Sequence, residues 1–189
     1  MGLRRLFSVA VAAAALALMT GCATKAPPYQ PSIDNVNTLK KTGASMASVG
    51  TFGTQPGAPG ATSIQVRASE MTPPAGGPYA QYIEEALKTE LELAKRLDPK
   101  ANVVITGVLL KNVINAGGMS TNNGEIEARF VVRRDGQVRY EKTKRATSEW
   151  ESSFAGAVAI PKAVQQYPVL VQLLLGQLFA DADFQAAIR

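Results

Sequence analysis

The residues from Glu125 to Arg133 alternate between apolar and polar side chains, and this pattern constrains the fold more than any other stretch. The apolar set is Ile126, Ala128, Phe130 and Val132. A period of two is typical of a β-strand that is buried on one face and solvated on the other. An Asp-Gly pair and a second run with apolar residues follow, so we expect a β-hairpin.

The apolar residues on either side of the turn also predict the register of this hairpin. A two-residue Asp-Gly turn would place Val132 opposite an arginine and bring an apolar and a charged side chain onto one face. A three-residue loop over residues 134–136 instead pairs Val132 with Val138 and Phe130 with Tyr140. We therefore expect the three-residue loop, with its glycine in the left-handed conformation.

The polar face of the hairpin is a candidate surface for a partner. Its basic residues are Arg129, Arg133, Arg139, Lys142, Lys144 and Arg145. The alternative is that the basic residues keep the sheet face solvated and its edge unpaired. We favour this interpretation because glutamates at positions 125, 127 and 141 lie among them. Among the basic residues, Arg129, Arg133 and Arg139 are the candidates for partner binding.

Two aromatic residues, Trp150 and Phe154, lie at the end of the strand that follows the turn. Aromatic residues in such a place usually fill the core. If either side chain is exposed, it becomes a candidate anchor for a partner protein.

The remaining elements indicate the fold class. Helical periodicity predicts a helix over 79–97. A helix of small residues is expected over 155–167, with a break or kink at Pro168. The stretch 169–179 is apolar on all sides, so we expect a buried helix there. Strands are expected over 46–52, 63–68 and 102–112, the last covered on both faces and closely approached at Gly107. We expect an α+β domain: a mostly antiparallel sheet of about five strands with two main helices packed on it.

The amino terminus has the anatomy of a secretory signal. Arg4 and Arg5 precede an uncharged apolar stretch over 6–19, and small residues follow. The stretch is about 14 residues long, whereas a helix that crosses a bilayer needs about 20. We expect a signal peptide over residues 1–21 and not a transmembrane anchor.

The run Leu18-Met19-Thr20-Gly21-Cys22 resembles the lipobox of bacterial lipoproteins, with Met19 where that family most often has leucine. The resemblance implies cleavage before Cys22, the one cysteine of the chain, and attachment of lipid to it. Ala23, where aspartate would retain a lipoprotein at the inner membrane, implies an outer-membrane location. The alternative is an ordinary signal peptide that leaves a free thiol. Prolines and polar residues then predict a flexible tether over 22–44 with a possible short helix over 32–41 that Ser32 can cap, before a single domain over 45–189.

Composition argues against several functions. The chain has no histidine, which excludes a Ser-His-Asp site and a histidine zinc site. The formal net charge of +5 is modest, and two of the charges would leave with the signal peptide, so we expect no nucleic-acid partner. We expect no metal and no cofactor.

The stretch from Met46 to Trp150 resembles the small lipoprotein domains of the penicillin-binding-protein activator and TolB amino-terminal type, through a helix ending in Asp98-Pro99, a strand running into Val104-Ile105-Thr106-Gly107, and the hairpin. Our first hypothesis is a non-enzymatic accessory lipoprotein that binds an envelope protein. The second is a carrier of a small molecule or lipid, in a cavity enclosed by the carboxyl-terminal helix and the glycine-rich loop 53–62. The third, an enzyme using Asp98 or Glu149 as acid or base, we regard as the weakest.

Overall fold

The computed structural model describes residues 23–189. The signal peptide, the lipobox and Cys22 lie outside the described residues. The elements are β1 Ala23–Lys25, α2 Ile33–Lys41, β2 Ser48–Thr54, β3 Ile64–Val66, β4 Ser69–Thr72, α3 Tyr79–Leu93, β5 Val103–Asn115, β6 Thr121–Arg134, β7 Gln137–Glu151, α4 Gly156–Phe179 and α5 Ala182–Ala187.

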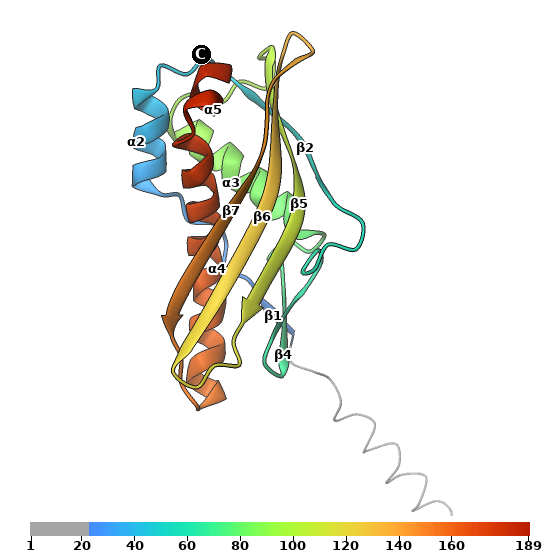
Figure 1. The fold of residues 1–189 in the computed structure, drawn as a ribbon, viewed down its shortest axis with the longest axis vertical. Coiled ribbons are helices and arrows are strands. Elements are labelled where there is room, and N and C mark those ends of the chain that lie inside the picture. Colours follow the sequence, from blue (N-terminus) through green and yellow to red (C-terminus); the bar gives the residue numbers. More distant parts are fainter. Residues whose placement is uncertain (1–22) are drawn as a thin grey trace, which may run out of the picture.

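The α+β class is confirmed, but the strands form two sheets where we expected one. The larger sheet has the order β2-β5-β6-β7, with β5, β6 and β7 antiparallel and β2 parallel to β5. The smaller sheet has the order β1-β4-β3. The two main helices, α3 and α4, lie against one face of the larger sheet, and the core lies between these layers (Figure 1).

The hairpin joins β6 and β7, as expected, but the predicted register is wrong. The turn has two residues, Asp135 and Gly136, with φ angles of 53° and 78°, and both adopt the left-handed conformation that suits a tight hairpin. Val132 pairs with Tyr140 and the next residue of β6 pairs with Val138, so Arg139 is an extra residue, a β-bulge. The bulge restores the alternation: Tyr140 is buried and Val138 is 50% exposed.

Strand β5 is buried on one face only, where we expected cover on both. Val103, Ile105 and Leu109 face the core, while Val104 and Val108 on the other face are half-buried. The reason is that the helices cover one face of the sheet. The close approach expected at Gly107 is confirmed, because a β-carbon added there would lie 2.3 Å from Cε1 of Phe52.

Helix α4 is continuous through Pro168, where we expected a break or kink between two helices. A proline inside a helix removes one hydrogen bond. The buried residues on both sides of Pro168, such as Val164 and Leu174, pack into the same core, and this burial outweighs the lost bond. The expected burial on all sides is also wrong, because Val169 and Leu173 are exposed.

The segment over 23–44 is part of the folded unit, where we expected a flexible tether. β1 pairs with β4, Ala26 is buried, and the N–H of Ala26 donates to the carbonyl of Thr72 at 2.8 Å. The expected short helix is present as α2, and Ser32 caps it as predicted by accepting from the N–H of Asn35. This segment is held by contacts with residues far away in the sequence. Its own prolines and polar residues carry no information about those contacts, so they predicted a tether.

Candidate functional site

The three basic candidates lie on the hairpin. Arg129 is exposed on the uncovered face of the sheet, 3.8 Å from Glu141. Arg133 is exposed near the turn, and Arg139 is the bulge residue. Within residues 23–189, neither Arg133 nor Arg139 takes part in an ion pair with a carboxylate.

Lys142 and Lys144 do not share the face of Arg129, which corrects the expected basic surface. Both side chains contact Asp181 at the start of α5, on the side of the sheet where the helices lie. The period of two along β7 is the physical reason. Residues 142 and 144 lie two and four places after the buried Tyr140 and therefore share its inner face, opposite Phe130 and Ala128 of β6.

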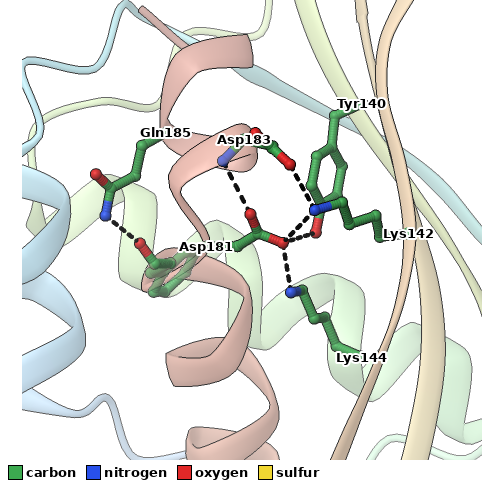
Figure 2. Close-up of polar contacts among 7 residues, drawn as sticks. Tyr140, Lys142, Lys144, Asp181, Asp183 and Gln185 are labelled. Carbon is green, nitrogen blue, oxygen red and sulfur yellow. Dashed lines mark hydrogen bonds and ion pairs between the residues drawn. The ribbon is translucent and has the colours of Figure 1, made fainter.

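Asp181 lies at the centre of a polar cluster that joins β7 to α5 (Figure 2). Its Oδ2 atom accepts hydrogen bonds from Lys144 Nζ at 2.5 Å and Tyr140 Oη at 3.1 Å. Its Oδ1 atom accepts from the N–H of Asp183 at 2.8 Å, which caps α5. Lys142 Nζ lies 3.4 Å from Asp181 and 2.6 Å from Asp183.

The electrostatics of this cluster favour ionised Asp181. Burial opposes the charge, but the bonds from Lys144, Asp183 and Tyr140 outweigh it and hold the pKa of the Asp181 carboxyl well below its usual value. Burial, together with the nearby carboxylates, raises the pKa of the Tyr140 hydroxyl. Both oxygens of Asp181 are occupied by donors of the protein itself, so the cluster is suited to fixing α5 in place.

The hairpin tip, defined as residues 133–139, is the most basic exposed feature beside this cluster. It carries three arginines and one aspartate, together with the exposed Val138. A hollow of about 560 Å³ lies between the tip and α5, lined by Arg134, Arg139, Tyr140, Glu141, Lys142, Asp183, Ala186 and Ala187. The positive charge of the tip is complementary to an acidic protein surface.

The two aromatic candidates differ in the exposure of their side chains. Trp150 is 8% exposed and fills the core, where the absence of a side chain at Gly124 leaves room for its indole ring. It is therefore not available as a surface anchor. Phe154 is 83% exposed and remains a candidate.

Glu90 is a buried carboxylate whose role the sequence did not reveal. Its Oε1 atom accepts from Tyr29 Oη at 2.5 Å, from the N–H of Ser32 at 2.9 Å and from Asn35 Nδ2 at 3.3 Å. Burial and the hydrogen bond to Glu90 raise the pKa of the Tyr29 hydroxyl far above its usual value. The available signal was a charged residue on the apolar face of a predicted helix. Glu90 attaches the amino-terminal segment to α3.

A cavity of about 640 Å³ lies beside this attachment, lined by Pro28, Tyr29, Thr51, Pro73, Pro74, Ala75, Gly76, Gln81, Tyr82, Glu84, Glu85 and Thr89. None of these residues belongs to the glycine-rich loop 53–62 or to α4, the two elements that the carrier hypothesis expected to enclose a cavity. The loop is fixed to β5 instead: the N–H of Asn112 donates to the carbonyl of Pro59 at 3.0 Å, and its Nδ2 donates to Gly60 at 3.1 Å.

The two carboxylates considered for catalysis lie apart from any such site. Asp98 Oδ1 accepts from the N–H of Lys100 at 2.9 Å and shapes a turn, and Glu149 is exposed on β7. Over residues 23–189, no three acidic or cysteine side chains gather in a way that could hold a metal ion. None of the helices formed by these residues has the length and hydropathy that a membrane span requires.

Comparison with known proteins gives likeness at the level of structure. No family model and no curated protein matches the sequence. The crystal structure of a DUF330 protein from Xanthomonas campestris is similar with a TM-score of 0.49 and 12% identity, covering 82% of this chain and 97% of that one. A protein from Caulobacter crescentus, described as a "putative lipoprotein", is similar with a TM-score of 0.46 and 10% identity, covering 82% and 96%.

Proposed function

We propose that this chain is a lipid-anchored accessory protein of the bacterial outer membrane, attached through Cys22, which binds a protein partner of the cell envelope and catalyses no reaction. The observation that carries the proposal is the place of Cys22. It follows a stretch with the anatomy of an export signal and directly precedes β1, the first element of the folded unit. Several acyl chains on one residue give stable membrane attachment, whereas one chain gives marginal attachment.

The hairpin tip is the surface that we assign to the partner. Strand β7 runs from the tip at Gln137 to Glu151, near the end where the chain enters the fold (Figure 1). At about 3.3 Å per residue, its length is roughly 45 Å. A lipid on Cys22 would therefore place the tip far from the attachment point, where unpaired arginines could meet an acidic envelope protein.

The carrier function is the less favoured alternative, for a structural reason. It required α4 and loop 53–62 to enclose a cavity, whereas α4 packs into the core and the loop is hydrogen-bonded to β5. The cavity beside Tyr29 lies elsewhere and is of a size seen in ligand sites. Native mass spectrometry of the purified protein tests it directly, since a carrier should retain a bound molecule.

The proposed function is tested by crosslinking in intact cells. The wild-type protein should be recovered from the membrane fraction with a crosslinked envelope protein, and Cys22→Ser should leave the membrane fraction. The double substitution Arg133→Ala with Arg139→Ala should lose the crosslinked partner and stay in the membrane. A matched control, Lys40→Ala with Lys41→Ala, removes two exposed charges from α2 and should keep the partner. Failure to recover any crosslinked protein, or full recovery with the arginine variant, would contradict the assignment.

A further inference from the structure

Three exposed apolar side chains gather at the end of the molecule where the chain enters the fold. Met119 is 73% exposed, Phe154 is 83% exposed and Val158 is 56% exposed. We call these three residues the entry-end patch. They belong to the stretches 116–120 and 152–161, and neither stretch contains a charged residue. Met119 and Phe154 line one hollow of about 280 Å³.

The backbone beneath the patch is held firmly by one arginine. The Arg67 guanidinium donates to the carbonyls of Ala116 at 2.6 Å, Ser153 at 2.7 Å and Phe154 at 3.1 Å, and also to Gly118 and Ser152. These bonds join the turn between β3 and β4 to both uncharged stretches. The Phe154 side chain thus remains exposed while its own carbonyl is fixed, which is what a preformed contact surface requires.

The same turn lies beside the site of the lipid. Arg67 is in the turn that leads into β4, and Glu70 of β4 pairs with Ala23 of β1. One peptide bond separates Ala23 from Cys22 in the sequence, so a lipid on Cys22 would be attached one residue before the folded unit begins. The chain enters at the end of the molecule where α4 begins (Figure 1).

We propose that the entry-end patch inserts into the surface of the bilayer that holds the lipid on Cys22, so that the domain stands on the membrane in one orientation. This inference rests on the proposed lipid attachment. The one charge between Met119 and Phe154, the Arg67 guanidinium, is half-buried and bonded to five acceptors of the protein itself. The exposed apolar side chains around it suit the boundary between headgroups and acyl chains. The other charges near this end of the fold fit the headgroup level: Glu151 is paired with Lys162 at 3.5 Å, and Glu70 is exposed. A short connection and an apolar contact together would hold the hairpin tip away from the bilayer.

Fluorescence quenching by lipids brominated in their acyl chains tests the orientation. The acylated full-length mature protein is reconstituted into phosphatidylethanolamine–phosphatidylglycerol vesicles as the wild type, as Phe154→Trp and as Val138→Trp. Val138 is the matched control, because it is also an exposed apolar residue but lies on the hairpin tip. The signal of buried Trp150 is subtracted from both variants by means of the wild type.

We expect quenching of the tryptophan at position 154 to be several times greater than at position 138. Equal quenching at the two positions, or a tryptophan at 154 that is shielded from water but not quenched, would overturn the inference; the second result would assign the patch to a protein partner. Mass spectrometry and flotation of the same samples separate the two proposals. If the protein is acylated and floats with the vesicles but position 154 is not quenched, the orientation is wrong and the lipid attachment stands.

Discussion

Replacing Glu90 with alanine should release the amino-terminal segment from α3. The substitution removes the acceptor of three hydrogen bonds, from Tyr29, Ser32 and Asn35. Each of the three lost bonds contributes about 1 kcal/mol net. Asn35 also donates to the carbonyl of Gln172 at 3.0 Å, so its side chain keeps one partner in the variant and adds no further cost. We therefore expect a cost of about 3 kcal/mol, which corresponds to about a hundredfold increase in local opening.

Hydrogen exchange of the backbone amides measures this opening. In the Glu90→Ala variant, protection of the amides in α2 should fall about a hundredfold, while the amides of β6 should change much less. Glu92→Ala is the control, because Glu92 lies on the same helix with its side chain exposed. If α2 is equally protected in both variants, the reasoning that Glu90 fixes this segment is refuted.

Further predictions concern the carboxyl-terminal cluster and the sheet. Asp181→Asn should lower the free energy of unfolding in urea by about 2 kcal/mol, because the bond from Lys144 loses its charged acceptor; an unchanged transition would contradict the role of the cluster. Because the pKa of Asp181 is depressed in the folded state, its contribution should be complete above about pH 4 and be lost as the pH falls toward the folded pKa, so that the difference between wild type and variant shrinks in acid. Gly107→Ala should cost about 2 kcal/mol, because its new methyl group would lie 2.3 Å from Phe52. Gly53→Ala on the adjacent strand meets nothing within 4 Å and should cost about 0.5 kcal/mol or less in the same urea assay.

Local periodicity predicted much of the fold. The hairpin of β6 and β7, the helix that became α3, the cap at Ser32 and the close approach at Gly107 all follow from patterns within a few residues. The register of the hairpin did not, because a bulge at Arg139 can correct the alternation and no local pattern identifies it. The continuity of α4 through Pro168 likewise depends on packing against other elements.

The amino-terminal segment and the candidate surface depended on contacts between distant residues. Tyr29 and Glu90 are 61 residues apart, so composition alone favoured a tether where the structure has a docked segment. Which of Trp150 and Phe154 is buried depends on the space left by Gly124 on the neighbouring strand. The grouping of Lys144 with the outward basic residues was wrong because Lys144 lies four places after Tyr140 and so shares the inner face with it.

The intact mass of the protein extracted from membranes tests the lipid attachment most directly. Lipid on Cys22, with the folded unit beginning at Ala23, is the claim on which both the function and the orientation depend. We expect a chain that begins at Cys22 and carries the added mass of acyl chains. A chain of unmodified mass with a free thiol, recovered by osmotic shock without detergent, would contradict it.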